Sequence, residues 1–479
     1  MNAGDFFVLL PVLVMAAAPV VVMMTAAFTK GRMRHATAVL LSLAGLAIAF
    51  AMLLVVSPAA PRQVTPLIIL DSYAVFYMGL IFASSFVVTI LSYSYLEGRD
   101  GSHHEYYILL LLATLGSAVL VAGSHFASFF LGLEILSISL YSLIAYVRVS
   151  ERSNEAGIKY LVLAAASSSF LLFGMALVYA QFGTMEFAGI ARKSADAAAH
   201  TPLLSAGLVM IIIGAGFKLA LVPFHMWTPD VYEGAPAPVS AFIASVSKGA
   251  MFALLLRYFT LVDIRAYGPL FMIFTVIAIA SMFTGNLLAL FQNNIKRVLA
   301  YSSIAHLGYL LVAFLAGGAL AITAVSYYLI SYFVTILGAF GIITVLSGKE
   351  RDADTLEEYR GLALRRPWIA GVFTAMLLSL AGIPLTAGFI GKFYVVTAGV
   401  GSALWLLVIV LAVNSAISLF YYLRIVVALY AHTAGEEAAP RLSLAGGIVM
   451  AVLTLLLLWL GVYPSPFIRI IQTTVAGLV

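Results

Sequence analysis

Long apolar runs dominate this sequence and restrict what it can fold into. Fourteen stretches carry few or no charges over roughly 18 residues or more, a length typical of membrane-spanning helices. They cover approximately residues 6–28, 36–56, 72–95, 106–123, 126–147, 158–182, 203–223, 237–259, 267–290, 295–317, 319–347, 367–400, 403–430 and 444–470. The sequence therefore predicts an all-α polytopic membrane protein with about 14 transmembrane helices.

The composition excludes several classes of protein. Of the 479 residues, 63% are hydrophobic and 9% are charged, whereas soluble domains carry about 25% charged residues. A soluble enzyme, a nucleic-acid-binding domain and a disordered chain are therefore excluded. There is no cysteine, which excludes thiolate-held iron–sulfur clusters and disulfides within this chain. We also find no phosphate loop, dinucleotide fingerprint or metal-binding histidine pair, so we expect no cofactor or metal here.

The basic residues between the runs are unevenly distributed and predict the orientation. With fourteen spans, the odd-numbered loops hold sixteen basic residues, and the even-numbered loops and the termini hold six. The sixteen are Lys30, Arg32, Arg34, Arg99, Arg148, Arg152, Lys159, Lys296, Arg297, Lys349, Arg351, Arg360, Arg365, Arg366, Arg424 and Arg441, and the six are Arg62, Arg192, Lys193, Arg257, Arg265 and Arg469. Basic loops usually face the cytoplasm. We therefore expect both termini on the outer, periplasmic side of a cell inner membrane, and no cleaved signal peptide because the first run follows Asp5 rather than a basic segment.

Three lysines and one glutamate lie within the apolar runs. They are Lys218, Lys248, Lys392 and Glu134. A charged side chain at the bilayer centre costs at least about 2.5–3.5 kcal/mol on insertion scales, so such residues usually face the bundle interior and serve a function. Snorkelling towards the membrane surface could explain one lysine, and a static Lys–Glu pair could explain two of the charges. Neither explains all four.

Helix breakers lie beside two of these lysines. Lys218 is five residues before Pro223, and Lys392 is eight residues after Pro384. Interrupted helices in two halves of a chain indicate repeats with the active site at the break, so we expect interrupted seventh and twelfth helices. If spans four to eight and nine to thirteen are two five-helix repeats, the repeats are inverted relative to each other, because each contains an odd number of spans. This predicts four parts: residues 1–105, 106–259, 260–430 and 431–479.

Polar residues follow the same helix faces as these charges. Ser137 and Tyr141 share a face with Glu134, Ser240 and Ser245 precede Lys248, and Ser302 and Ser303 precede His306. Helix–helix hydrogen bonding would explain most of the serines. His306 is either a packing residue or part of a proton relay, because imidazole exchanges a proton near neutral pH.

Desolvation supplies the chemistry. Burial disfavours the charged ammonium, so a lysine inside a membrane can be neutral or protonated near pH 7, and a nearby carboxylate favours the protonated form. A line of such lysines, joined by hydroxyls, histidine and water, would carry protons through the membrane interior. The free energy has to come from outside this chain, which contains no redox or nucleotide motif.

Four motifs together resemble a known family. They are "LGLEILSISLYSLIAY", "GFKLALVPFHMWTPDVYEGAPAPVSAFIASVSKGA", "NNIKRVLAYSSIAHLGY" and "LAGIPLTAGFIGKFYV". They resemble the antiporter-like membrane subunits of respiratory complex I (NADH–quinone oxidoreductase) over nearly the whole chain. A lysine, rather than a glutamate, in the twelfth span resembles the subunit N branch of this family more than the M or L branch.

The resemblance implies fourteen helices with two inverted five-helix repeats, and proton translocation as a subunit of a translocase. Glu134 and Lys218 would be the pair of the fifth and seventh helices, Lys248 the central relay lysine, and Lys392 the lysine near the outlet. His306 is carried over less firmly. NADH, FMN, iron–sulfur clusters and quinone would belong to other subunits. The partners would be other complex I membrane subunits, including antiporter-like neighbours, and the lipid bilayer.

Other interpretations remain open. The chain could be a cation/proton antiporter subunit of a related complex, although oxygen ligands suit Na⁺ better than lysines do. It could also be a non-pumping structural membrane subunit. The charged segment "GKERDADTLEEYRGLALRRP" is expected to be a solvated cytoplasmic connection, or alternatively a contact with a neighbouring subunit.

Overall fold

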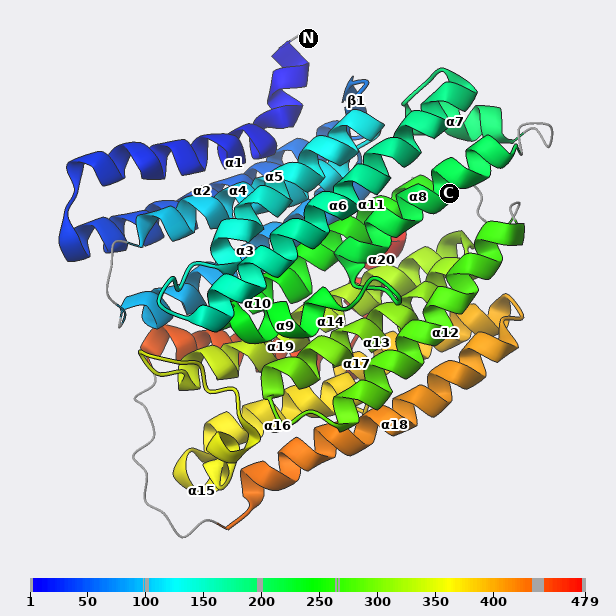
Figure 1. The fold of residues 1–479 in the computed structure, drawn as a ribbon. Helices are drawn as coiled ribbons and strands as arrows, with labels where there is room; N and C mark the ends of the chain where they lie inside the picture. The colour runs from blue at the N-terminus through cyan, green and yellow to red at the C-terminus, as the bar shows by residue number, and fades with distance from the viewer. Residues whose placement is uncertain are drawn as a thin grey trace.

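The computed structural model describes residues 3–97, 99, 103–195, 201–262, 265, 268–432 and 443–475. Within these residues, thirteen helices are long and apolar enough to cross a membrane, and two shorter apolar helices take the twelfth place together. Figure 1 shows most of them running side by side in one bundle. This confirms the predicted all-α polytopic fold. Arg441, one of the sixteen basic loop residues, lies outside the described residues.

The long helices follow the predicted runs. The first seven places are taken by α1 (Ala3–Phe28), α2 (Gly31–Val56), α3 (Ser72–Glu97), α4 (His104–Ala122), α5 (Phe126–Ile144), α6 (Glu151–Phe182) and α8 (Pro202–Leu219). The next four are α10 (Ala237–Phe242) continuing through η3 (Ile243–Ser247) into α11 (Lys248–Leu261), then α12 (Gly268–Leu290), α13 (Ile295–Ala316) and α14 (Gly318–Leu346). The last three are α16 (Pro367–Ala381) with α17 (Ala387–Gly401), α18 (Trp405–Tyr430) and α19 (Leu444–Val462).

The seventh and twelfth places are interrupted, as predicted. Helix α8 stops at Leu219, and the chain turns through Ala220 in the left-handed region (φ 59°) before the short helix α9 (Trp227–Gly234). Helix α16 stops at Ala381 and the chain passes Leu385, also left-handed (φ 71°), before α17 begins. A non-glycine residue in this region is strained, so each break is maintained by its surroundings. The two half-helices approach their breaks from opposite ends of the bundle.

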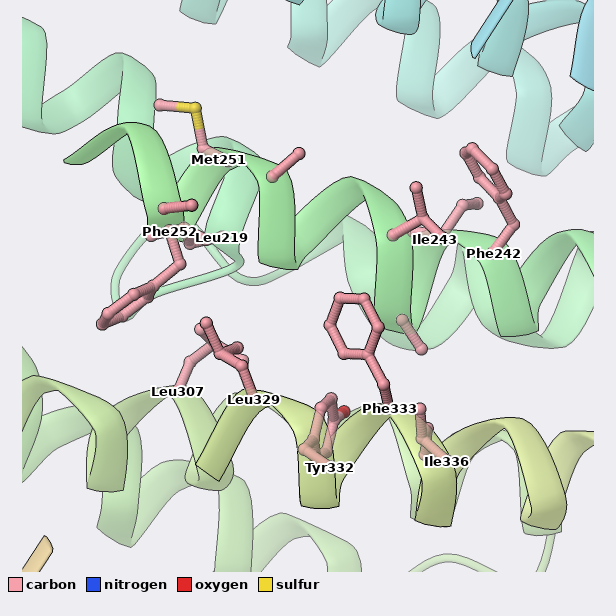
Figure 2. Packing of buried hydrophobic residues seen from close by; sticks show 14 of the residues in the cluster. Leu219, Phe242, Ile243, Met251, Phe252, Leu307, Leu329, Tyr332, Phe333 and Ile336 are labelled. Carbon is pink, nitrogen blue, oxygen red and sulfur yellow. The ribbon is translucent and has the colours of Figure 1, made fainter. Parts of the chain in front are cut away.

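The most deeply buried helices form the centre of the bundle. Every residue in the most apolar window of 237–261 is buried, as are 94% of that window in α13 and 89% in α14. Figure 2 shows the apolar contact between these helices, with Phe333 and Ile336 of α14 directed towards the segment around Ile243. A Cβ atom on Gly249 would lie 2.2 Å from the ring of Phe333. The absence of a side chain at Gly249 therefore allows α14 to pack closely against the helix that carries Lys248.

The two ends of the bundle are structurally different. One end carries the hairpin of β1 (Arg62–Thr65) and β2 (Ile68–Leu70) together with α7 (Phe187–Ser194); we call it the hairpin end. The start of α1 lies here, because Arg62 pairs with Asp5 at 2.7 Å. The other end carries α9, the segment 347–355, η5 (Leu356–Tyr359) and α15 (Leu362–Arg365); we call it the Lys296 end.

Some elements differ from the sequence expectation. The eighth span is not a uniform α-helix, because η3 is a π-helical turn directly before Lys248. The fourteenth predicted run is divided: α19 ends at Val462, and the amphipathic helix α20 (Ser465–Val475) packs against α3 and α14. Prolines at positions 464 and 466 explain this division, since proline cannot donate the backbone hydrogen bond that would continue the helix.

Candidate functional site: a line of buried lysines

Glu134 and Lys218 lie near each other but are not joined directly. The Nζ atom of Lys218 donates to the hydroxyls of Ser137 (3.1 Å) and Tyr160 (2.9 Å). Glu134 accepts instead from the hydroxyl of Ser168 at 2.5 Å. Because Ser137 follows Glu134 by about one turn of α5, both partners of the predicted pair use the same helix face. Within the described part of the chain, no ion pair connects the two.

Lys248 is bound to a hydroxyl of the tenth span. It is 1% exposed, and its Nζ donates to Ser303 Oγ of α13 at 2.8 Å. The ring of Tyr232, on α9, lies 5.2 Å from the same ammonium, and its hydroxyl is 3.5 Å from Ser303 Oγ. The π-helical turn η3 immediately precedes Lys248. Such turns occur frequently at functional sites.

His306 belongs to a chain of aromatic hydroxyls. Its Nδ1 is 2.6 Å from the hydroxyl of Tyr328, and its Nε2 is 3.3 Å from that of Tyr422. The Tyr422 hydroxyl also contacts Ser302 Oγ, the neighbour in sequence of the Lys248 partner. His306 therefore connects the Lys248 region with α14 and α18. This geometry fits a relay better than a packing role alone.

Lys392 completes the line at the second helix break. Its Nζ donates to the Ser415 hydroxyl and to the carbonyl of Ala381, both at 2.8 Å. It also lies 5.2 Å from the centre of the Tyr309 ring, which contacts the ring of His306 at 5.5 Å between centroids. Ala381 is the last residue of α16, so the ammonium occupies the negative end of a half-helix. Lys218 lies in the last turn of the other half-helix, α8, but its ammonium binds hydroxyls of α5 and α6 rather than a carbonyl.

All four of these side chains are buried, with exposed fractions of 2% for Lys218, 1% for Lys248, 4% for His306 and 7% for Lys392. A lysine that snorkels to the membrane surface would not be enclosed in this way. The structure thus brings the predicted basic residues into two groups. One group surrounds Lys218, and the other runs from Lys248 through His306 to Lys392.

The short helix α9 contacts both groups. Its Trp227 packs against Tyr160, the partner of Lys218, with ring centroids 4.9 Å apart, while its Tyr232 contacts Lys248 and Ser303. Among the described residues, no hydrogen bond passes from one group to the other. The other predicted serines, Ser240 and Ser245, bind backbone carbonyls at 2.9 Å and 2.6 Å, which fits the helix-packing interpretation.

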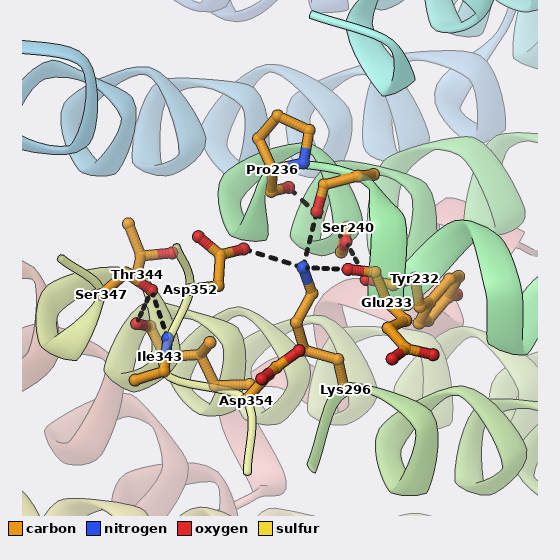
Figure 3. A network of polar contacts seen from close by, with 12 residues as sticks. Tyr232, Glu233, Pro236, Ser240, Lys296, Ile343, Thr344, Ser347, Asp352 and Asp354 are labelled. Atoms are coloured by element: carbon orange, nitrogen blue, oxygen red, sulfur yellow. Dashed lines mark hydrogen bonds and ion pairs between the residues drawn. The ribbon is translucent and has the colours of Figure 1, made fainter. Parts of the chain in front are cut away.

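A charged network at the Lys296 end was not predicted from the sequence (Figure 3). Lys296 is 0% exposed, and its Nζ donates to Asp352 (2.8 Å) and to the carbonyls of Glu233 (2.9 Å) and Ala235 (2.6 Å). Asp352 also accepts from Tyr95 at 2.7 Å and pairs with Arg99 at 3.4 Å. Burial alone would raise the pKa of Asp352, but the charge and hydrogen bond of Lys296 lower it below its ordinary value. The segment expected to be a solvated connection is therefore anchored to α3, to α13 and to Arg99.

A second buried ion pair lies at the hairpin end. Arg257 of α11 donates two hydrogen bonds to Asp71, at 2.7 Å and 2.8 Å, and is 3% exposed. The sequence analysis counted Arg257 among the loop charges, and Asp71 directly precedes the third apolar run, 72–95. Nothing in a single sequence distinguishes such a pair from solvated charges, because each partner lies next to a predicted boundary.

Among the described residues, no group of three or more His, Asp or Glu side chains is arranged to hold a metal ion, and the chain has no cysteine. The groups that the site offers are amines, hydroxyls, an imidazole and one carboxylate, all of which can exchange protons.

The fold and the site together define a class of polytopic membrane proteins in which a line of charged side chains crosses a helix bundle. Comparison with known proteins agrees, because residues 123–418 match the family described as NADH:quinone oxidoreductase/Mrp antiporter, TM. The chain is 56% identical over 495 residues to the NADH-quinone oxidoreductase subunit N of Nitrosospira multiformis, covering 99% of this chain and 97% of that protein. It is 49% identical over 485 residues to the subunit N of Ectopseudomonas mendocina, covering 98% and 97%.

A solved structure gives the same result. A chain in the respiratory complex I of Thermus thermophilus with bound aureothin superimposes with a TM-score of 0.82 at 31% identity, covering 96% of this chain and 98% of that one. The chain belongs to the family of NADH-quinone oxidoreductase subunit N, the antiporter-like membrane subunits of complex I.

Proposed function

We propose that this chain is a proton-translocating membrane-arm subunit of an NADH–quinone oxidoreductase, in which Glu134, Lys218, Lys248, His306 and Lys392 carry the protons. The observation that supports this most strongly is the set of three buried ammonium groups, each bonded to a neutral hydroxyl. A hydroxyl can pass a proton on, whereas a carboxylate at the same place would hold the ammonium as a fixed ion pair.

The Glu134–Lys218 pair is the proposed input of the driving force. Two opposite charges about 4 Å apart attract by about 4 kcal/mol at an effective dielectric constant near 20. When Glu134 moves closer, Lys218 keeps its proton; when Glu134 moves away, the desolvated ammonium releases it. In this structure the hydroxyl of Ser168 donates a hydrogen bond to Glu134. Exchange of this one hydrogen bond is enough to change the distance between Glu134 and Lys218.

Proton movement then proceeds along the second group. Lys218 passes its proton towards Lys248, and Lys248, which cannot bind a further proton, passes one of its own on through Ser303. The hydroxyls of Ser302 and Tyr422 and the imidazole of His306 offer the next positions. Lys392 receives the proton at the break between α16 and α17. Water is required where no direct hydrogen bond exists, above all at α9.

The energy comes from partners. We assign NADH, FMN, the iron–sulfur clusters and quinone to other subunits of the assembly. We further assign the Lys296 end to the cytoplasm, which places both termini on the outer side of the cell inner membrane. The proposed division of the chain is residues 1–105, the repeats 106–259 and 260–430, and residues 431–479.

Neighbouring subunits are required beside Glu134. Glu134 is only partly buried in this chain, and the flanking Leu131 and Ile138 on α5 are 54% and 59% exposed. A carboxylate facing lipid would be costly. We therefore assign this face of α5 to a contact with another membrane subunit of the complex, with a polar group opposite Glu134.

Replacement of Lys218 tests the proposed function. We expect Lys218→Ala in the intact assembly to lower the number of protons pumped per NADH oxidised at least five-fold, because the first exchangeable ammonium is lost. Proton uptake by membrane vesicles during NADH oxidation measures this. Lys349→Ala is the matched control, since Lys349 is an exposed lysine in the segment after α14. Full pumping by an assembled Lys218→Ala variant would contradict the proposal.

Two alternatives remain distinguishable by the same preparation. A cation/proton antiporter subunit would give Na⁺-dependent transport, which the proposed function does not require. A non-pumping structural subunit would lose assembly rather than coupling when Lys218, Lys248 and Lys392 are neutralised together. Subunit composition, measured beside pumping, separates these outcomes.

A further inference from the structure

A solvent cavity opens at the Lys296 end of the bundle, directly above the buried Lys296. Its volume is about 540 Å³, and its wall includes Arg99, Glu233, Ala235, Asp352 and Asp354. Three of these wall residues, Glu233, Ala235 and Asp352, are the acceptors of the Lys296 ammonium. Lys296 therefore lies behind this part of the cavity wall, with its ammonium bound by one carboxylate and two carbonyls.

The line of lysines begins directly beyond Lys296. Lys296 and Ser303 are seven residues apart on α13 and share one face, with a rise of about 10 Å between them. Ser303 accepts the hydrogen bond of Lys248. Tyr232, which contacts Lys248 and Ser303, directly precedes Glu233, whose carbonyl binds Lys296. About two turns of α13 therefore separate the residue behind the cavity wall from the relay.

The segment that carries Asp352 is tied to two other parts of the bundle through this one carboxylate. It is irregular backbone between α14 and η5, and Asp352 joins it to Tyr95 and Arg99 of the α3 region as well as to Lys296. The amide of Ala353 is held by Ser347 Oγ at 3.1 Å. A single carboxylate thus connects the N-terminal helices, this segment and the helix that carries Ser303 and His306.

We propose that this cavity is the proton-uptake vestibule for Lys248, and that the Lys296–Asp352 pair is the gate at its bottom; the uptake role rests on the proposed function. With Asp352 in place, the Lys296 ammonium has no free donor directed inward, and water does not reach Ser303. Withdrawal of Asp352 frees the ammonium and opens the route. Lys296 acts here as a gating residue and not as a member of the relay.

Cysteine labelling tests the gate independently of turnover, because the chain contains no cysteine of its own. Ala300 lies on α13 between Lys296 and Ser303 and is 0% exposed. We expect Ala300→Cys to react slowly with a membrane-impermeant methanethiosulfonate in the otherwise intact assembly. Adding Asp352→Asn, or Lys296→Gln if that variant assembles better, should increase the labelling rate at least ten-fold, from one side of the membrane only.

Matched variants control this experiment. Glu357→Gln removes a carboxylate from the neighbouring η5, where Glu357 pairs only with Arg360 at 3.1 Å on the surface, and it should leave labelling unchanged. Thr355→Cys, at the exposed mouth of the cavity, should label rapidly in every background. Equal labelling of Ala300→Cys with and without Asp352→Asn would overturn the gate.

Pumping measured on the same variants separates the gate from the function. A gate that stays open should lower the protons pumped per NADH oxidised at least two-fold in Asp352→Asn, while NADH oxidation stays above half. If proton pumping and NADH oxidation fall in equal proportion, Asp352 is a structural anchor, and this result would contradict the gate. If Lys248→Ala pumps normally while the labelling pattern holds, the proposed function and the uptake role fail, and only the Lys296–Asp352 gate between the cavity and the interior of α13 stands.

Discussion

Five lysines of this protein fall into two kinds according to their partners. Lys218, Lys248 and Lys392 bind neutral hydroxyls or a carbonyl, whereas Lys159 and Lys296, near one end of the bundle, bind the carboxylates of Asp230 and Asp352. A carboxylate fixes the charge of its partner; a hydroxyl leaves it free to change. The same side chain thus anchors the structure in one setting and exchanges protons in the other.

Ser303 should be essential to the exchange at Lys248. Hydrogen bonds to charged groups contribute about 1.5–3 kcal/mol, so we expect Ser303→Ala to slow proton pumping about 10-fold or more. Ser303→Thr, which keeps the hydroxyl, should recover most of the rate. Ser169→Ala is the control, because Ser169 is an exposed serine that bonds only to the carbonyl of Ala165. Unchanged pumping by Ser303→Ala would remove Ser303 from the route.

Asp352 predicts a pH dependence of stability. Its pKa lies below the ordinary value of 3.8 in the folded protein, so the folded state binds fewer protons than the unfolded state near that pH. The stabilisation is therefore complete above about pH 4 and is lost as the pH falls through the folded pKa. The melting temperature of Asp352→Asn should be lower than that of the parent at pH 7, and the difference should shrink below pH 3.8. A constant difference would contradict this assignment.

The sequence was informative at some of these positions and not at others. Lys218, Lys248, Lys392 and Glu134 are visible because each is a lone charge in an apolar run. Lys296 is not, because it stands beside Arg297 at the start of a span, where a solvated charge is normal. Its burial depends on Asp352, 56 residues later, and single-sequence reasoning has no access to that contact.

At the level of the elements, the breaks in the helices determine where the lysines lie. The breaks after α8 and α16 expose carbonyl ends inside the bundle. Proline and glycine predicted both breaks, because they weaken helices through known backbone effects. The π-helical turn η3 was not predicted, since its sequence of Ile243–Ser247 contains neither residue. It packs against α3, α4 and α14.

Gly388 should be required for the break of the twelfth span. A Cβ atom there would lie 1.9 Å from the carbonyl oxygen of Ser379 in α16, a distance that forces the half-helices apart. We expect Gly388→Ala to destabilise the protein by about 1–3 kcal/mol, as overpacking does, and to displace Lys392 from Ala381. Gly371→Ala is the matched control, because nothing lies within 4 Å of its Cβ position. Thermal unfolding measures both, and equal effects would contradict the argument.

At the level of the whole molecule, the sides of the bundle face two kinds of surroundings, lipid and neighbouring subunits. Lipid and neighbouring subunits both accept apolar side chains, so hydrophobicity predicted the fourteen spans but not which faces meet protein. The structure adds that information at Glu134, where a carboxylate reaches the side of the bundle between the exposed Leu131 and Ile138.

Leu131 should therefore lie at a subunit contact. A photoreactive phenylalanine analogue in its place should crosslink this chain to another membrane subunit in the purified assembly. The same variant purified without partner subunits provides the control and should give no crosslinked product of higher mass. A crosslink to lipid alone in the full assembly would show that this face meets the bilayer.

The aromatic contact at α9 has an electrical consequence. Two aromatic residues of α9 lie between the two positive sites, with Trp227 against Tyr160 beside Lys218 and Tyr232 against Lys248. A protonated Lys218 repels a protonated Lys248 through these aromatic residues before any proton passes between them. Lys218 and Lys248 should then be protonated alternately. A change at Glu134 on α5 would reach Lys248 on α11 as a change in electrostatic potential rather than as a displacement of atoms.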